Sequence, residues 1–128
     1  MVKLSNATLG DLSPKVATPS YDRASLTPGI MHIGVGNFHR AHQAVYLDRL
    51  FAKGLDHDWA LVGAGVMPGD TRMREALAAQ DWLTTVVELD PEGLSARVTG
   101  AMVDFCDTTP DAIIARLGDP AIRIVSLT

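Results

Sequence analysis

One short segment of the sequence has residue types and spacing suited to binding a phosphate group. Gly34 and Gly36 come directly after an apolar run and directly before a stretch with helical spacing. In such a turn the first glycine permits a tight bend, and the second lets the backbone approach a pyrophosphate at the start of the helix. Dinucleotide-binding turns usually have a third glycine, and His39 occupies that position here. The residues alone support dinucleotide binding and a purely structural turn about equally.

Asp70 is the second residue with a candidate role, because an acidic side chain after the second strand of such a unit can bind ribose hydroxyls. It lies 36 positions after Gly34, farther than the roughly 20 residues of compact units. A long first helix and the loop at 53–58 account for the excess. The alternative is that Asp70 caps a helix starting at Thr71, and the spacing alone favours this cap.

Three histidines close together, His32, His39 and His42, raise the question of a metal site. His39 and His42 are three residues apart, so they could share a metal on one helix face. No carboxylate or cysteine completes a site at a recognisable spacing. We therefore expect no metal, a satisfied buried histidine on the strand and two histidines on the helix surface.

Two charged residues of the same helix have open roles. Arg40, near the helix start, is either a partner for a phosphate or carboxylate or a solvated side chain. Asp48 falls on the apolar face of the helix, so we expect it to have a buried partner rather than a catalytic task. The sequence shows no Ser/His/Asp set, no paired carboxylates and no P-loop, and we assign no catalytic residue.

The elements that must position these residues follow from hydrophobic periodicity and from the Gly and Pro residues between them. Residues 1–29 are expected to be an irregular lead-in, because Pro14, Pro19 and Pro28 interrupt them. The pattern predicts strands at 30–35, 59–66 and 122–127, helices at 38–51, 70–79 and 110–117, and a hairpin formed by 83–89 and 94–103. This order predicts an α/β fold in which the three strands are parallel and the hairpin is an appendage.

Composition narrows the class of protein. The chain has 128 residues, of which 47% are hydrophobic, with 11 Lys and Arg against 15 Asp and Glu. The net charge of −4 without a basic run argues against nucleic acid. The single Cys106 excludes an internal disulfide and fits a reducing compartment. No apolar run suits a membrane span and no signal peptide is evident, so we expect a soluble, cytoplasmic protein.

The end of the sequence bears on domain organisation. The chain stops within an apolar strand, Ile122 to Thr128. Such a strand needs a further element to cover its edge. We therefore expect the 128 residues to be the N-terminal part of a longer protein, with a lead-in at 1–29 and a truncated domain at 30–128.

The run Ile33-Gly34-Val35-Gly36-Asn37-Phe38-His39-Arg40-Ala41-His42-Gln43-Ala44 resembles the N-terminal signature of the mannitol dehydrogenase family, the polyol-specific long-chain dehydrogenases. In that family His39 in the third-glycine position is the normal form. The similarity continues through Asp58-Trp59, Gly63-Ala64-Gly65, Gln80-Asp81 and 122–128, and so covers nearly the whole chain.

The resemblance implies a Rossmann-like doubly wound, mostly parallel sheet with an inserted hairpin. It also implies metal-independent, NAD(P)-dependent oxidation of a secondary alcohol of a polyol to a ketose, of the mannitol-to-fructose type. The residues that match the family's cofactor site are Ile33, Gly34, Val35, Gly36, Asn37, Phe38, His39, Arg40, Asp70 and Thr128. In this reading Asp70 binds the adenosine ribose and Thr128 lies near the nicotinamide ribose.

The resemblance also bears on cofactor choice and catalysis. Asp70 matches the acid that favours NAD over NADP, which moves us from the cap to the ribose interpretation. Pro68-Gly69 replaces the polar group that can precede this acid, and with Arg72 and Arg74 nearby some NADP use is allowed. The family's catalytic lysine, asparagines and histidine lie in a helical C-terminal domain, so the 128 residues alone should be inactive.

Two alternatives remain open from the sequence. A sugar-acid reductase acting on fructuronate or tagaturonate would carry the same opening motif. A nucleotide-binding module without catalysis would need only the cofactor half. The expected partner in the leading reading is a small polyol or ketose, and the sequence does not specify which one.

Overall fold

The structure, a computed structural model, describes residues 1–128. Its helices are α1 (Asn37–Ala41), α2 (Gln43–Ala52), α3 (Asp70–Ala78) and α4 (Pro110–Leu117). Its strands are β1 (Val16–Ala17), β2 (Pro28–Ile33), β3 (Ala60–Ala64), β4 (Thr84–Asp90), β5 (Gly93–Thr99), β6 (Met102–Phe105) and β7 (Ile124–Leu127). Two short 3₁₀ helices, Asn6–Asp11 and Arg23–Ser25, precede β2, which begins at Pro28 inside the expected lead-in.

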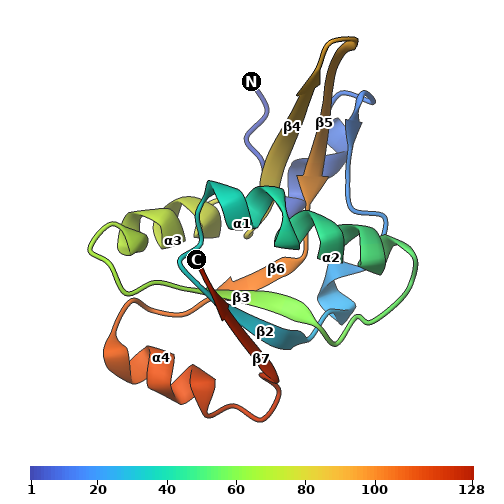
Figure 1. Cartoon of the computed structure of the whole chain (residues 1–128). Coiled ribbons are helices and arrows are strands. Elements are labelled where there is room, and N and C mark those ends of the chain that lie inside the picture. The colour runs from blue at the N-terminus through green and yellow to red at the C-terminus, as the bar shows by residue number, and fades with distance from the viewer.

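The main sheet has four parallel strands in the order β6-β3-β2-β7. Met31 pairs with Val62 of β3 on one side and with Val125 of β7 on the other, which makes β2 a central strand. The parallel arrangement of the three predicted strands is confirmed. Because the chain crosses over by a helix between successive strands, their carboxyl ends meet at one edge of the sheet (Figure 1).

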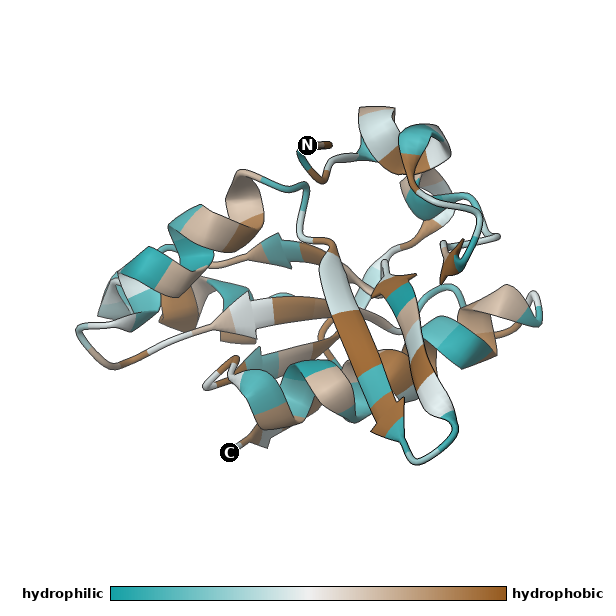
Figure 2. Cartoon of the chain, turned by 90° about the horizontal axis from the view of Figure 1, so that it is seen from above, coloured by the Kyte–Doolittle hydropathy of each residue, from teal (hydrophilic) through white to brown (hydrophobic).

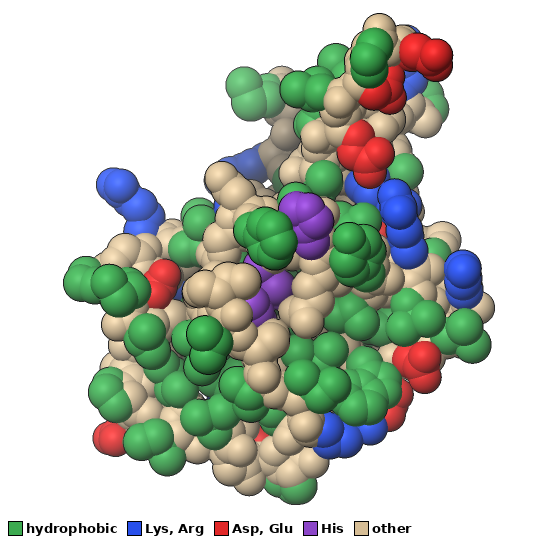
Figure 3. Space-filling view, in the orientation of Figure 1, with side chains coloured by type: hydrophobic (Ala, Val, Ile, Leu, Met, Phe, Trp, Pro, Cys, Tyr) green, Lys and Arg blue, Asp and Glu red, His purple; other side chains and the backbone are tan.

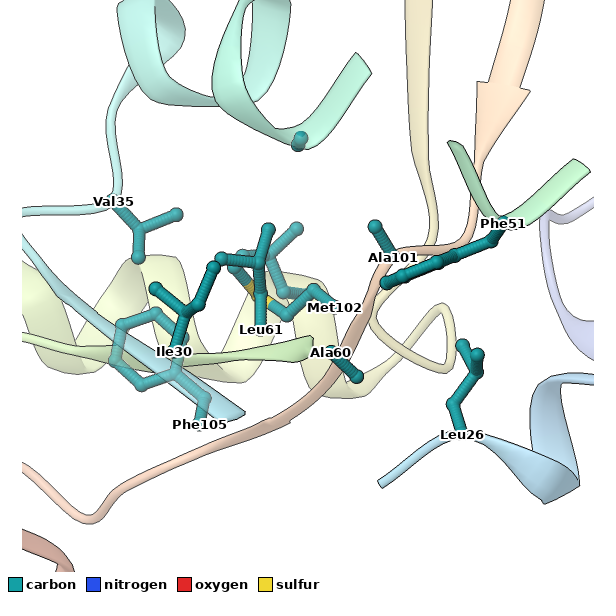
Figure 4. Close-up of a cluster of buried hydrophobic side chains, with 11 residues drawn as sticks. Leu26, Ile30, Val35, Phe51, Ala60, Leu61, Ala101, Met102 and Phe105 are labelled. Atoms are coloured by element: carbon teal, nitrogen blue, oxygen red, sulfur yellow. The ribbon is translucent and has the colours of Figure 1, made fainter. Parts of the chain in front are cut away.

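Helices cover both faces of this sheet. Figure 1 shows α1, α2 and α3 on one face and α4 on the other. The alternation of side chains along each strand supplies both cores, since Leu61 packs with residues of α2 and α3 whereas its neighbour Val62 packs against α4. The larger cluster also contains Val35, Phe51 and Phe105, and Figure 4 shows its side chains spread along the sheet from Val35 and Phe105 at one end to Phe51 at the other. The doubly wound α/β fold is therefore confirmed.

The hairpin stands away from the sheet. Strands β4 and β5 pair antiparallel from Thr84↔Thr99 to Asp90↔Gly93, and β1 joins the outer side of β5. Both strands alternate between hydrophobic and hydrophilic segments (Figure 2). Burial is confined to the base of the ribbon, and Leu89 and Leu94 at the tip are exposed. The predicted hairpin is thus confirmed as an appendage.

The predicted second hairpin strand, 94–103, is wrong in its extent. The run breaks at Gly100, and the residues after it form β6, which pairs parallel with β3 in the main sheet. The Arg23 side chain holds the redirected segment, because its guanidinium donates to the carbonyl groups of Gly100 and Met102. A Cβ atom at Gly100 would lie 2.7 Å from the Arg23 side chain, so this crossing needs glycine.

The single helix predicted over 38–51 is interrupted at His42. The backbone of His42 has φ −121° and ψ −85°, outside the helical region, and separates α1 from α2. Its Nδ1 atom lies 2.8 Å from the carbonyl oxygen of Phe38, the oxygen that the His42 backbone N–H would have bonded in a continuous helix. The side chain of His42 therefore replaces its own backbone at the break.

Asp48 is buried and has the partners that its position on the apolar face led us to expect, of which Tyr21 and Arg97 are half-buried. Its Oδ1 atom accepts hydrogen bonds from the Tyr21 hydroxyl at 2.6 Å and the Gly100 N–H at 3.1 Å. Arg97 forms an ion pair with the other oxygen at 3.9 Å. Burial and the neighbouring carboxylate raise the pKa of Tyr21 above its usual value. The cluster joins α2 to the base of the hairpin.

None of the helices has the length and the apolar composition that a membrane crossing requires.

Candidate functional site at the carboxyl edge of the sheet

The glycine turn lies at the carboxyl end of β2, where the sequence placed it. Gly34 has φ +91°, and a Cβ atom there would lie 2.7 Å from the Thr128 carbonyl oxygen. Only glycine suits this position, because the backbone is left-handed and β7 passes close by. Gly36 is the N-cap of α1, and the nearest atom to a Cβ there would be 3.9 Å away. The open space at Gly36 lets a ligand approach the backbone.

Arg40 is engaged with the same turn. Its Nη2 atom donates to Asn37 Oδ1 at 2.6 Å, and its Nε atom donates to the Gly36 carbonyl at 3.3 Å. The Arg40 N–H makes the first backbone bond of the helix, to the same carbonyl at 3.1 Å, so the N–H groups of Asn37, Phe38 and His39 precede it. The turn thus combines donor N–H groups with a guanidinium that is partly buried.

Asp70 begins α3, and its side chain points back toward the end of β3. Its Oδ2 atom accepts the Met67 N–H at 2.7 Å, and no hydrogen bond is made by Oδ1. A Cβ atom at Gly65 would lie 2.2 Å from the Asp70 side chain, so glycine at the end of β3 makes room for the carboxylate. The cap interpretation is wrong, because Gly69 is the N-cap and no side chain caps this helix.

The two arginines beside Asp70 differ in their contacts. Arg74 turns toward β6, where its Nε atom donates to the Phe105 carbonyl at 3.0 Å and its Nη2 atom pairs with Asp107 at 3.1 Å. Arg72 is exposed and forms no ion pair. Of the two cations that the sequence offered for a 2′-phosphate, only Arg72 is therefore unengaged.

His39 is not on the helix surface as expected, because it is only 2% exposed and stacks on His32. The ring centroids are 3.7 Å apart and the planes differ by 10°. Its Nε2 atom lies 2.8 Å from Gln43 Oε1, whereas its Nδ1 atom has no partner. Burial, together with the neighbouring His32, lowers the pKa of His39 to about 4, so the ring is neutral near pH 7.

His32 is a satisfied buried histidine, as expected, and its partners come from β7. Its Nδ1 atom lies 2.8 Å from Ser126 Oγ, and its Nε2 atom lies 3.1 Å from Thr128 Oγ1. The Thr128 hydroxyl also donates to the Gly34 carbonyl at 3.1 Å. Burial lowers the pKa of His32 as well. Ser126 and Gln43 escaped the sequence reasoning, although Ser126 and Thr128 share one face of a strand, which is a readable signal.

Exposed apolar side chains surround these polar groups. The residues at the edge that leave apolar surface in solvent are Phe38 (66% exposed), Val66 (67%), Met67 (66%) and Leu127 (72%). Figure 3 shows histidine side chains in the middle of this face among hydrophobic and uncharged ones, while acidic side chains gather on the hairpin. His42, as expected, lies on the surface, stacked on Phe38 at 4.3 Å.

The groups at the carboxyl edge can bind a ligand, but they include no acid–base pair for catalysis. This edge offers backbone N–H groups, one carboxylate with a free oxygen and one hydroxyl, and it has apolar borders. No group of three or more His, Cys, Asp or Glu side chains is arranged to hold a metal ion. The donor N–H groups and the carboxylate at this edge are of the kinds that bind phosphate and hydroxyl groups.

Comparison with known proteins gives three consistent matches. The family described as the mannitol dehydrogenase Rossmann domain matches residues 28–128. A mannitol 2-dehydrogenase of Cereibacter sphaeroides is 66% identical over 119 residues, which are 91% of this chain and 25% of that protein. The solved mannitol 2-dehydrogenase of Pseudomonas fluorescens, a ternary complex with NAD and D-mannitol, superimposes with a TM-score of 0.95 at 44% identity.

The matches cover this chain but not the relatives. The Pseudomonas structure covers 99% of this chain and 26% of its own. A D-sorbitol dehydrogenase in substrate-free form has a TM-score of 0.86 at 40% identity and covers 98% of this chain and 27% of its own. The chain thus spans about a quarter of the length of the relatives that it matches.

Proposed function

The chain belongs to the mannitol dehydrogenase family, and from this premise we propose that it is the NAD-binding part of a polyol dehydrogenase. The parent enzyme would oxidise a secondary alcohol of a sugar alcohol to a ketose, as the names of its mannitol 2-dehydrogenase relatives indicate. Under this proposal residues 30–128 form the cofactor-binding unit and 1–29 its lead-in. The acid–base groups and the contacts that choose the polyol belong to the rest of the parent enzyme.

One observation carries the cofactor assignment. The ends of β2 and β3 bring an open glycine N-cap and a carboxylate with one free oxygen to the same edge of the sheet. Dinucleotides need this pair of features, because their pyrophosphate lies on a glycine turn and their ribose hydroxyls donate to an acid. The residues therefore fit NAD. The Pseudomonas relative is itself a complex with NAD, which supports the choice of cofactor.

The proposed contacts follow the geometry. Residues 33–40 would hold the pyrophosphate through backbone N–H groups, with Arg40 adding positive charge beside the turn. Asp70 would accept the ribose hydroxyls through Oδ1 while Oδ2 keeps its loop bond to Met67. Thr128 would face the nicotinamide ribose from the end of β7. When bound, NAD would supply the hydride acceptor for the oxidation.

The site favours NAD over NADP. The Asp70 carboxylate would repel a 2′-phosphate, and Arg74 is already bonded to Phe105 and Asp107. Arg72 remains as the one nearby cation that could compensate. We therefore propose NAD as the working cofactor and NADP as a poor substitute.

We place the parent enzyme in polyol and carbohydrate metabolism and in the cytoplasm. Cys106 is free and buried, which fits a reducing compartment. The proposed partners are a small polyol and its ketose, with neither nucleic acid nor membrane involved.

A polyol panel assayed with the parent enzyme and NAD tests the function. We expect oxidation of mannitol or a close stereoisomer, with NADH formed in equal amount. Reduction of fructuronate or tagaturonate without polyol oxidation would replace the proposal with a sugar-acid reductase. NAD binding without turnover of either class would leave a nucleotide-binding module. As a companion test, the 128 residues alone should show no turnover with any polyol.

A further inference from the structure

Three side chains form a continuous hydrogen-bonded chain from the interior to the candidate cofactor edge. Ser126 Oγ lies 2.8 Å from His32 Nδ1, His32 Nε2 lies 3.1 Å from Thr128 Oγ1, and Thr128 Oγ1 donates to the Gly34 carbonyl at 3.1 Å. His32 is 2% exposed, whereas Thr128 is exposed. The hydrogen-bonded series therefore passes through a buried ring and ends on the surface at the glycine turn.

The number of protons available limits which group donates and which accepts at each contact of this hydrogen-bonded series. A hydroxyl has one proton to donate and two lone pairs to accept. We assign the Thr128 proton to the Gly34 carbonyl, the shorter of the two outward hydroxyl contacts, and His32 Nε2–H then donates to Thr128. A neutral imidazole then has an acceptor at Nδ1, and Ser126 donates to it. Ser126 Oγ also lies 3.4 Å from Gln43 Oε1. In the reversed direction Ser126 would donate there and Thr128 would donate to His32, so the 3.1 Å contact with Gly34 would lose its proton; we assign the direction that keeps the shorter contact.

This direction determines what Thr128 offers to a ligand. Its proton is used by Gly34 and one lone pair by His32, so one lone pair remains for a further donor. Thr128 therefore acts as a hydrogen-bond acceptor at this edge. A cofactor group that meets it must be a donor, such as a ribose hydroxyl or the carboxamide NH₂ of a nicotinamide.

His39 ties the same ring to the cofactor turn. In turns with a third glycine, that glycine lets the helix pack closely on the strand. Here the rings of His32 and His39, stacked 3.7 Å apart, fill the space between the strand and the helix instead. His32 thereby contacts both sides of the edge, through its ring face to the first turn of α1 and through its nitrogens to β7. The stack requires neutral rings, and burial favours that form for both.

We propose that His32 is a positioning residue for the nicotinamide half of the cofactor, and that it acts by holding Thr128 as a hydrogen-bond acceptor at the carboxyl edge. This inference rests on the proposed NAD-binding function. It assigns a role to a residue that carries neither phosphate-binding nor catalytic chemistry.

The decisive experiment is a double-mutant cycle in the parent enzyme. His32→Phe keeps the stacked ring and removes both nitrogen contacts, whereas Thr128→Val removes the hydroxyl. We expect each substitution to raise the Kd for NAD about three- to tenfold, the effect of about one hydrogen bond. Because His32 acts through Thr128, the double variant should bind NAD no more weakly than Thr128→Val alone. The matched control is His57→Phe, since the His57 side chain hydrogen-bonds only the Phe51 carbonyl, and we expect no change in the Kd for NAD.

The possible outcomes separate the two claims. If the wild-type enzyme does not bind NAD, the proposed function fails. If it binds NAD, and His32→Phe binds equally well or the two losses add in the double variant, only the role of His32 is overturned. Should His32→Phe fold poorly, the ¹⁵N shifts of His32 in the wild-type enzyme decide. The Nε2–H form with a shift change on NAD addition supports the proposal, and the Nδ1–H form overturns it.

Discussion

Two buried polar clusters lie at opposite edges of the same parallel sheet, and they are built on different principles. At the amino edge Arg23, Asp48 and Tyr21 surround Gly100, and their charged or polar groups all have protein partners. At the carboxyl edge His32 and His39 are neutral, and one nitrogen of His39 has no partner. The first cluster is closed and the second is open toward a ligand surface.

The difference shows how polar burial can serve architecture or recognition. A buried charge is tolerated only when its hydrogen bonds are met, so the Arg23 and Asp48 contacts specify one path for the chain from the hairpin into β6. Neutral rings carry a smaller desolvation penalty than charged groups. Through Thr128, the cluster at the carboxyl edge also leaves a hydrogen-bond acceptor free at the surface. Breaking each cluster in turn should therefore affect different properties.

The largest effect is expected at the amino edge. Asp48→Ala would leave Arg97, the Tyr21 hydroxyl and the Gly100 N–H without their partner. We expect the free energy of unfolding to fall by about 3–5 kcal/mol, with an unchanged Kd for NAD in the protein that remains folded. Urea denaturation and NAD titration measure the two quantities.

Arg49→Ala is the matched control for that substitution. Arg49 is one helix position from Asp48, but it is exposed and pairs with Glu88 at 3.4 Å. Its loss should change the free energy of unfolding by less than about 1 kcal/mol. Equal losses of unfolding free energy in Asp48→Ala and Arg49→Ala would mean that the buried cluster stabilises the fold no more than an exposed ion pair does.

Acid should act mainly on the carboxyl edge. The pKa of His39 is about 4 in the folded protein against 6.5 when unperturbed. Between these values the unfolded chain binds the proton and the folded protein does not, so stability falls as the pH falls from 6.5 toward 4. For one histidine with this shift the loss approaches about 3 kcal/mol, and burial of His32 adds to it in the same direction.

Urea midpoints measured across that pH range, in wild type and in His39→Phe, isolate this contribution. The variant should lose part of the slope, because its ring cannot titrate. Identical slopes in the two proteins would show that His39 is not held neutral by the fold.

Local sequence patterns predicted the elements well, and contacts distant in sequence account for what they missed. The glycine turn at Gly34, the crossover helices and the hairpin follow from periodicity and turn residues within short windows. The end of the hairpin strand at Gly100 depends on Arg23, which lies 77 positions away. Neither residue alone reveals that contact.

The candidate site shows the same difference between features that local patterns reveal and features that depend on contacts distant in sequence. Gly34 and Gly36 were singled out by residue type and order, because a phosphate turn is a local feature. The ribose role of Asp70 came from the family resemblance, because its spacing alone favoured a helix cap. His39 was misplaced on the surface, since its burial depends on the ring of His32 across the β2–α1 packing. Ser126 was missed because it becomes a partner of His32 only when β7 pairs with β2.

Substitution of Asp70 tests cofactor binding at the carboxyl edge. Asp70→Ala should remove charge-assisted bonds to the ribose, worth about 1.5–3 kcal/mol, and raise the Kd for NAD about tenfold to a hundredfold. NADP should gain relative to NAD, because the repulsion of its phosphate is lost and Arg72 is free to approach. The kcat/KM ratio for the two cofactors measures this.

Asp70→Asn separates the cofactor role from the loop role. Its amide oxygen keeps the acceptor for the Met67 N–H but lacks the charge. We expect it to shift the cofactor ratio in the same direction as Asp70→Ala with a smaller change in melting temperature. An unchanged kcat/KM ratio for NAD and NADP in both variants would mean that Asp70 only bonds the loop at Met67 and does not bind the cofactor.

Hydrogen exchange of the parent enzyme with and without NAD tests the central claim, that the carboxyl edge is the cofactor site and the amino edge is structural. We predict slower exchange on NAD addition in 34–42, 65–70 and 126–128, and no change in the hairpin 84–99 or around Gly100. Protection of the hairpin with unchanged exchange at 34–42 would contradict this account.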